Sequence, residues 1–170
     1  LERKGLKVLG VIPYNPMMAR PTVGQILDEA GYELLFGQDY IENPISRIIV
    51  GAMKPEDAVR YITDGCFLIT PGDREDVIVA ALGCFKDADK QKLKISGLVL
   101  TGDITPFPSV MNLLSKSSIP VLWAKEDTYT VTAAIHDLTV KIRPRDEVKV
   151  STAIKLIKDH VDLKSILKGI

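Results

Sequence analysis

The amino-acid sequence predicts an α/β fold, a three-layer sandwich with a mostly parallel open sheet built of repeated βα units. Apolar runs of strand length recur at residues 46–50, 67–69, 95–100 and 119–123. Each run is followed by a tight turn and then by apolar residues at helical spacing. Repeated strand–turn–helix units with short turns make the strands parallel and place helices on the faces of the sheet. The turns, at Gly51, Gly72, Gly102 and Lys125, should therefore lie along one edge of the sheet.

Composition excludes several classes of protein. The 22 basic and 22 acidic residues cancel, so bulk charge gives no reason to expect nucleic acid or an anionic membrane as a partner. No apolar run approaches the roughly 18 residues that cross a bilayer, and no secretory signal is present, so we expect a cytoplasmic protein. Cys66 and Cys84 lie in apolar contexts without metal-site spacing, and no metal site is expected. A length of 170 residues suits one domain, with or without an appendage.

The N-terminal elements come before the repeats. Residues 7–14 have the composition of a strand ended by proline. Pro21 and Thr22 begin a helix that runs to about Ala30, with Gly31 as its stop, and an irregular segment follows.

Further signals place the later elements. Pro55 begins the helix after the first repeated strand, and a helix starts at about Ser109. Asp127 and Thr128 cap the next helix, and residues 140–142 are expected to form an edge strand. The charged residues 86–94 predict a solvated loop.

A helical tail should begin at about Asp146, with Asp162 capping a final turn. Its apolar stripe consists of Val150, Ile154, Ile157 and Val161. The eight basic and four acidic residues from 141 onward favour a solvated helix face over a nucleic-acid site.

Residues 68–83 contain the most informative turn. Asp73 occupies the expected N-cap of a helix, and Asp76 completes an acidic capping pattern. One interpretation is an anion site, formed by the amides of Gly72 and Asp73, the Thr70 hydroxyl and the Arg74 guanidinium. The alternative is a well-capped helix whose acidic first turn complements its dipole. Local chemistry favours the capped helix, because the acidic residues would repel a phosphate and the Walker signature is absent.

Three segments resemble the motifs of the DRTGG domain, at residues 50–53, 69–74 and 99–102. Asp73, Arg74, Thr101 and Gly102 match the residues that name this family, whereas Asp103 stands where the second glycine is expected. The resemblance covers about residues 40–140. Together with their strand-end positions, it implies a candidate ligand-binding set of Gly51, Thr70, Gly72, Asp73, Arg74, Thr101 and Gly102.

A second resemblance lies at the beginning of the chain. Residues 10–14 and 19–22 look like the last strand and helix of a P-loop domain similar to dethiobiotin synthetase and cobyrinic acid diamide synthase. In the family, such a domain precedes DRTGG in long phosphate acetyltransferases and in shorter phosphotransacetylase-like proteins. We therefore expect a piece of a longer protein, with a P-loop remnant at 1–39, a DRTGG domain at 40–143 and a helical tail at 144–170.

The resemblance implies a non-catalytic regulatory or ligand-sensing module, with an adenine nucleotide or another small anionic metabolite as its ligand and no further cofactor. The alternatives are a purely structural dimerisation module and a fragment of a phosphate acetyltransferase or ATP-dependent ligase. His136 and His160 lack catalytic partners at a recognisable spacing, so no catalytic residue is assigned. We expect a homodimer, because an open sheet leaves unpaired edges and DRTGG modules of some inorganic pyrophosphatases, where they lie between CBS domains, help to form dimers.

Overall fold

The computed structural model describes residues 5, 7–84 and 95–169, so the loop predicted at 86–94 lies outside the described residues. The chain divides into two compact units, Pro21–Val140 on the one hand and Leu1–Arg20 with Lys141–Ile170 on the other. The boundaries expected at residues 39 and 143 stay predictions. In the part of the chain that the structure describes, no helix is long and apolar enough to cross a membrane.

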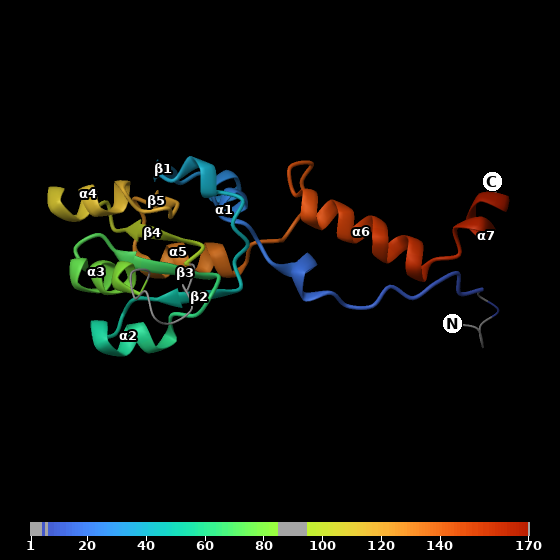
Figure 1. The fold of residues 1–170 in the computed structure, drawn as a ribbon, viewed down its shortest axis with the longest axis horizontal. Coiled ribbons are helices and arrows are strands. Elements are labelled where there is room, and N and C mark those ends of the chain that lie inside the picture. Colours follow the sequence, from blue (N-terminus) through green and yellow to red (C-terminus); the bar gives the residue numbers. More distant parts are fainter. Residues whose placement is uncertain (1–4, 6, 85–94, 170) are drawn as a thin grey trace. The chain divides into compact units, whose positions relative to one another are not determined.

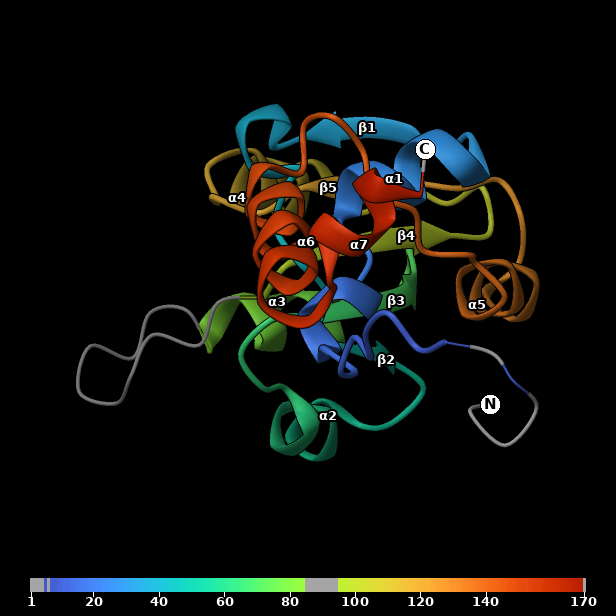
Figure 2. The ribbon, with the colours of Figure 1, turned by 90° about the vertical axis from the view of Figure 1, so that its right-hand side faces the viewer.

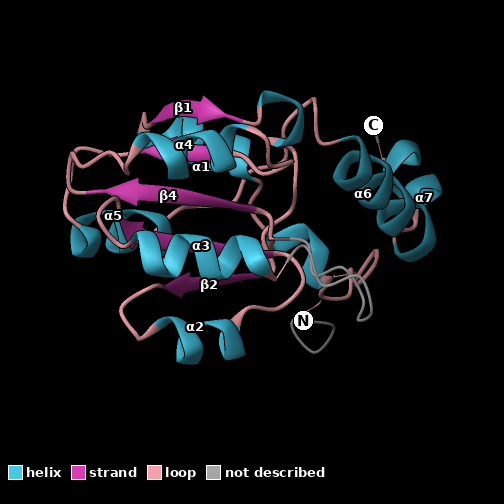
Figure 3. Cartoon of the chain, turned by 60° about the vertical axis from the view of Figure 1, so that its left-hand side comes forward, coloured by secondary structure: helices cyan, strands magenta, loops and turns pink. Residues whose placement is uncertain are grey.

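The Pro21–Val140 unit contains a five-stranded sheet with the strand order β1-β5-β4-β3-β2. Its strands are β1 (Glu33–Phe36), β2 (Arg47–Val50), β3 (Cys66–Pro71), β4 (Gly97–Thr101) and β5 (Val121–Trp123). The strands from β2 to β5 are parallel, and β1 pairs antiparallel with β5 (Figure 3). The mostly parallel open sheet is therefore confirmed.

The edges of the sheet differ from the prediction. The segment expected to be irregular contains β1, whose four residues are too few to show a clear alternation of apolar and polar side chains. The strand expected at residues 140–142 is wrong, since these residues form no strand. The edge beside β5 is already occupied by β1.

Helices cover both faces of the sheet. One core joins the sheet to α2 (Pro55–Tyr61), α3 (Glu75–Gly83) and α4 (Pro108–Ser115), and the other joins it to α1 (Val23–Ala30) and α5 (Thr128–His136). Successive strand residues alternate between the two cores, as the pleat requires: Leu68 and Leu98 belong to the first, Phe67 and Val99 to the second. The predicted three-layer arrangement is confirmed (Figure 1).

Most helix ends follow the sequence signals. The Thr22 side chain accepts from the Gln25 amide, Gly31 ends α1 at φ 70°, and Asp127 accepts from two amides of α5. The N-cap predicted at Asp73 is wrong. The helix α3 begins at Glu75 with Arg74 at its N-cap, because a turn closed by the Arg74 amide and the Pro71 carbonyl occupies residues 71–74.

The other unit contains η2 (Pro16–Ala19), α6 (Glu147–His160) and α7 (Leu163–Lys168), with α6 seen nearly end-on in Figure 2. The predicted tail helix and the Asp162 cap, which accepts from the Ser165 amide, are confirmed. The strand predicted at residues 7–14 is wrong: an isolated bridge between Gly10 and Val161 is the pairing found there within the described residues. The segment has the composition of a strand, but it pairs with no strand within the described residues.

Candidate ligand site at the carboxyl edge of the sheet

The carboxyl ends of the four parallel strands share one edge of the sheet. Figure 3 shows the arrowheads of β2 and β4 pointing toward it, and that of β1 pointing away. A pocket of about 330 Å³ opens there between the turns after β2 and β3 and the start of α5. It is lined by Val50, Gly51, Ala52, Pro71, Asp73, Arg74 and Thr128. We call it the strand-end pocket, and its volume is at the lower end of the range for small-molecule sites.

The Arg74 guanidinium fixes one wall of this pocket. It donates to the backbone carbonyls of Gly51 (3.3 Å) and Met53 (2.7 Å), which belong to the turn after β2. It also donates twice to the Asp76 carboxylate, at 2.9 and 3.1 Å. Four donor interactions are thereby used inside the protein, so Arg74 holds two turns together rather than presenting a free guanidinium to an anion.

The Arg74–Asp76 pair also sets the local electrostatics. Hydrogen bonds from Arg74 hold the pKa of the Asp76 carboxyl below its usual value. The same bonds raise the pKa of Arg74, and the nearby Asp73 charge adds to that effect. Both groups therefore remain charged at neutral pH, and their charges largely cancel beside the pocket.

Gly72 lies where the turns after β3 and β4 touch. Its amide donates to the Thr101 carbonyl at 3.2 Å, so this amide is not available to a ligand in the geometry observed. A Cβ atom at this position would lie 2.6 Å from the Ile104 carbonyl carbon and would overlap the carbonyl oxygen. Only glycine permits this close approach of the two turns.

The backbone of the turn after β4 explains why glycine follows threonine in the family motif. Gly102 and Asp103 both have left-handed backbones, with φ angles of 86° and 59°. Asp103 is the one described non-glycine residue with a positive φ angle. Aspartate tolerates this conformation better than most side chains, but glycine suits it best. The position where the family motif expects a second glycine is therefore one at which the backbone favours glycine.

The crevice between β4 and β5 is closed. The connection after β4 leads to one face of the sheet and the connection after β5 leads to the other. In open α/β sheets, ligands usually bind between two such strands. Here the Gly102 amide donates to the Glu126 carbonyl at 2.8 Å, and the Thr101 and Thr128 hydroxyls are 2.7 Å apart. These bonds join the two turns, and the open space lies instead beside the turns of β2 and β3.

Thr70 lies behind the pocket wall rather than in the pocket. The residue is fully buried, and its hydroxyl has no hydrogen-bond partner among the described residues. A Cβ atom on Gly51 would lie 3.0 Å from both the Thr70 hydroxyl and Val77, which places the hydroxyl beside the core under α3. Gly51 is thus a packing requirement as well as part of the lining.

The structure brings three of the seven candidate residues into the pocket, namely Gly51, Asp73 and Arg74. Thr70, Gly72, Thr101 and Gly102 support the turns around it. Thr128 was not among the candidates, although its position at a helix start after the last parallel strand was a usable signal.

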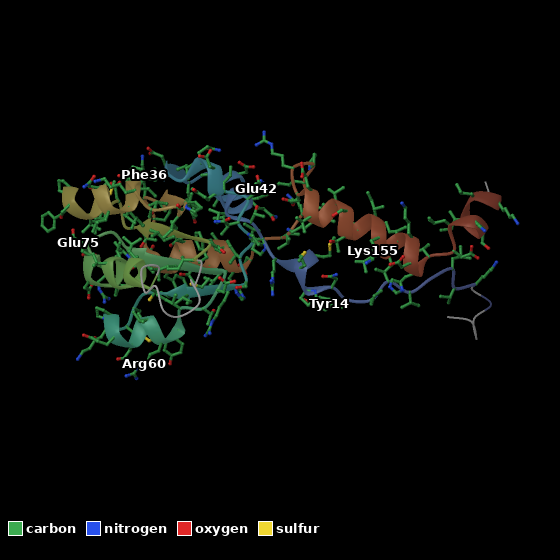
Figure 4. All side chains as sticks on the ribbon, in the orientation of Figure 1. Tyr14, Phe36, Glu42, Arg60, Glu75 and Lys155 are labelled. Atoms are coloured by element: carbon green, nitrogen blue, oxygen red, sulfur yellow. The ribbon has the colours of Figure 1, made fainter. Side chains whose placement is uncertain are left out.

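Of the acidic residues near α3, Asp73 alone faces the pocket. Glu75, labelled in Figure 4, accepts from the Phe107 amide at 2.6 Å, and Asp76 is bonded to Arg74. Asp73 is exposed and also lines a second hollow of about 330 Å³ beside residues 104–108. No hydrogen bond of its carboxylate to another described residue is found, so its oxygens can accept from a ligand. Within the same residues, no three metal-binding side chains gather.

Fold and site together define a small α/β module in which an Asp-Arg turn and a Thr-Gly turn meet at one edge of a parallel sheet. The chain belongs to the DRTGG domain family, whose family model matches residues 25–138. The resemblance predicted from the motifs is confirmed.

A solved structure shares the fold. It contains the CBS and DRTGG domains of the regulatory region of Clostridium perfringens pyrophosphatase, complexed with activator, diadenosine tetraphosphate. The TM-score is 0.57 at 21% sequence identity, over 83% of this chain and 64% of that one.

Curated relatives are phosphate acetyltransferases. That of Nitratidesulfovibrio vulgaris is 31% identical over 155 residues, which are 89% of this chain and 22% of the relative. Those of Pseudomonas putida and Synechocystis are 26% and 27% identical, over 95% and 94% of this chain and 23% of each relative. The chain thus spans less than a quarter of the length of these relatives.

Proposed function

We propose that this chain is a non-catalytic, ligand-sensing regulatory module of a longer, cytoplasmic, phosphotransacetylase-like protein. The observation that carries the proposal is the strand-end pocket, which the Asp-Arg turn of the family motif builds together with the turn after β2. The regulatory region of the pyrophosphatase neighbour is complexed with a dinucleotide activator, and the curated relatives are much longer enzymes. The first supports an adenine nucleotide as ligand, and the second supports a longer parent protein, in which we propose a P-loop domain upstream of this chain.

The pocket favours the nucleoside end of such a ligand. The phosphate-binding groups expected from the sequence are engaged, since the Gly72 amide bonds to Thr101 and the Arg74 guanidinium bonds to Asp76 and two carbonyls. The Asp73 carboxylate is an acceptor, which suits ribose hydroxyls, the groups that strand-end acidic residues bind in dinucleotide folds. In this arrangement the phosphates point toward solvent.

A thermal-shift titration tests the proposal. Adenosine, ATP, diadenosine tetraphosphate and inorganic phosphate are compared as ligands. A ligand at about 100 times its Kd stabilises the folded chain by roughly 2.7 kcal/mol. Adenosine and ATP should raise Tm, whereas phosphate alone should not.

Matched variants locate the binding. Asp73→Asn should abolish the shift, and Asp103→Asn, on the neighbouring turn outside the pocket lining, should keep it. The absence of any shift with all the nucleotides would contradict ligand sensing. A response to phosphate but not to adenosine would retain a ligand site and overturn the orientation of the ligand.

A structural module is the second candidate, favoured by one observation. The motif residues are bonded within the protein: Arg74 donates to the carbonyls of Gly51 and Met53, and the Thr101 hydroxyl is bonded to that of Thr128. If their role is only to hold turns together, Arg74→Ala lowers stability, and no nucleotide changes Tm in either protein. Formation of acetyl phosphate by the purified chain would instead favour a fragment of a phosphate acetyltransferase, the third candidate.

A further inference from the structure

The second hollow at the carboxyl edge of the sheet has a volume of about 330 Å³, equal to that of the strand-end pocket. We call it the Phe107 hollow, and its lining consists of Asp73, Glu75, Ile104, Thr105, Pro106, Phe107 and Pro108. Asp73 lines both hollows, so they meet at this residue. Every lining residue belongs to the Pro21–Val140 unit, so both hollows are complete within that unit.

Phe107 exposes an apolar ring in the lining of this hollow. It is 70% exposed, whereas the other exposed large apolar residues described in this unit are 37–45% exposed, with the exception of Tyr129. Tyr129 carries a hydroxyl that water can bond, and it directly follows Thr128 of the strand-end pocket. Phe107 has no such polar group, so its exposure to water is unfavourable and calls for a further explanation.

The backbone holds Phe107 in a fixed position. Its amide donates to the Glu75 carboxylate at 2.6 Å, which ties the turn after β4 to the start of α3. Phe107 also lies between Pro106 and Pro108, whose rings restrict the backbone on both sides. A group that is already held in place loses little freedom when a ligand binds, so this exposed ring is prepared for a contact.

Building on the nucleotide-sensing function proposed above, we propose that the Phe107 hollow is the subsite for the base. A purine ring stacks on Phe107, and the Asp73 carboxylate accepts from the ribose hydroxyls where the two hollows meet. The ribose then extends into the strand-end pocket. Each hollow alone is at the lower end of the range for small-molecule sites, so a nucleoside that spans both gains contacts that neither offers alone.

The chemistry of the hollow suits a base better than a phosphate. Ile104, Pro106 and Pro108 provide an apolar margin around the Phe107 ring. Residues 21–140 hold ten Lys and Arg against seventeen Asp and Glu, a net charge of −7, which disfavours phosphate. Stacking on an aromatic side chain uses the face of the base. A purine, which has the larger face, should therefore bind more tightly than a pyrimidine.

Isothermal titration calorimetry of the full chain with adenosine tests the proposal. Phe107→Ala should raise the Kd about 5- to 150-fold, the range that the loss of a base–aromatic stack produces. The Tm of the free chain should hardly change, because the side chain is mostly exposed. Leu113→Ala is the matched control, since Leu113 is 42% exposed on α4 and lines neither hollow. It should leave the Kd unchanged, and uridine should bind the wild-type chain more weakly than adenosine.

Two conservative variants separate stacking from simple apolar contact. Phe107→Trp keeps an aromatic face and should bind adenosine with a Kd close to that of the wild-type chain. Its fluorescence should decrease saturably, because a stacked base quenches an indole, and the wild-type chain with Trp123 alone provides the blank. Phe107→Leu keeps apolar bulk without a ring and should bind as weakly as Phe107→Ala.

The outcomes distinguish the base subsite from the proposed function. If Asp73→Asn abolishes adenosine binding and Phe107→Ala leaves the Kd unchanged, the base subsite is overturned and the proposed function stands. Adenosine binding by Phe107→Leu as tight as that of the wild-type chain would overturn stacking as well. A wild-type chain that binds neither adenosine nor ATP would contradict the proposed function itself, and the base subsite with it.

Discussion

Gly72→Ala is the substitution that the site geometry predicts most sharply. The added Cβ atom would lie 2.6 Å from the Ile104 carbonyl carbon, whereas real Cβ atoms essentially never approach other atoms closer than 3.0 Å. The neighbour is backbone and cannot rotate away, so the turns after β3 and β4 must separate. That separation also breaks the 3.2 Å hydrogen bond from the Gly72 amide to the Thr101 carbonyl.

Two contributions set the magnitude. Overpacking of a close contact costs about 1–3 kcal/mol, and the lost hydrogen bond about 0.5–1.5 kcal/mol. We therefore expect the free energy of unfolding to fall by roughly 2–4 kcal/mol, a large part of the typical 5–15 kcal/mol of a domain. For a chain of this size, Tm should fall by about 5–15 °C.

Urea unfolding followed by tryptophan fluorescence measures this effect. Trp123, in β5, is the single tryptophan, so its signal reports on the sheet unit. Gly83→Ala is the control, because Gly83 is a helical residue with no described atom outside its own helix within 4 Å of an added Cβ, and it should stabilise by up to about 1 kcal/mol. A loss below about 0.5 kcal/mol for Gly72→Ala would refute the close approach of the two turns.

Substitutions at three further positions give distinct outcomes in the same urea assay. Thr70→Val should be neutral or stabilising by about 1 kcal/mol, because it removes a buried hydroxyl that has no partner among the described residues; a marked loss of stability would indicate a further bond. Asp103→Gly should stabilise slightly and Asp103→Val should destabilise by about 1–2 kcal/mol, since the backbone is left-handed there. Arg74→Ala should cost about 1–2 kcal/mol at pH 7, much reduced from the full value of its bonds by solvent exposure. The Asp76 part of that cost rests on a folded-state pKa below the unfolded value of about 3.9. It is fully present well above that value and is lost progressively as the pH falls from there through the folded-state pKa. A difference independent of pH down to about pH 2 would exclude the ion pair.

The repeated βα units could be predicted because each strand is a continuous apolar run followed by a short turn with glycine or a capping residue. Signals of this kind are local, and Thr22, Gly31 and Asp127 show them clearly. The short strand β1 lacked them, since its position depends on pairing with β5. Residues 7–14 carry a strand signal, but a strand forms only beside another strand, and none is supplied within the described residues.

The sequence could predict which turns meet at the sheet edge, but not the contacts that they make there; the candidate site stays a prediction. Motif positions identify the turns that meet at the sheet edge, because parallel topology brings them together. The partners of Arg74 could not be predicted, since the carbonyls of Gly51 and Met53 come from another turn. Only the folded geometry shows that these donors are engaged and that Asp73 lines the pocket.

The most direct test of ligand sensing is amide chemical-shift mapping of the ¹⁵N-labelled chain during titration with ATP. Binding in the strand-end pocket predicts saturable shifts for residues 51–53, 72–74 and 128, with little change along α6 and α7. Spectra that remain unchanged at millimolar ATP, or shifts confined to residues outside the pocket, would contradict a nucleotide site at the carboxyl edge of the sheet.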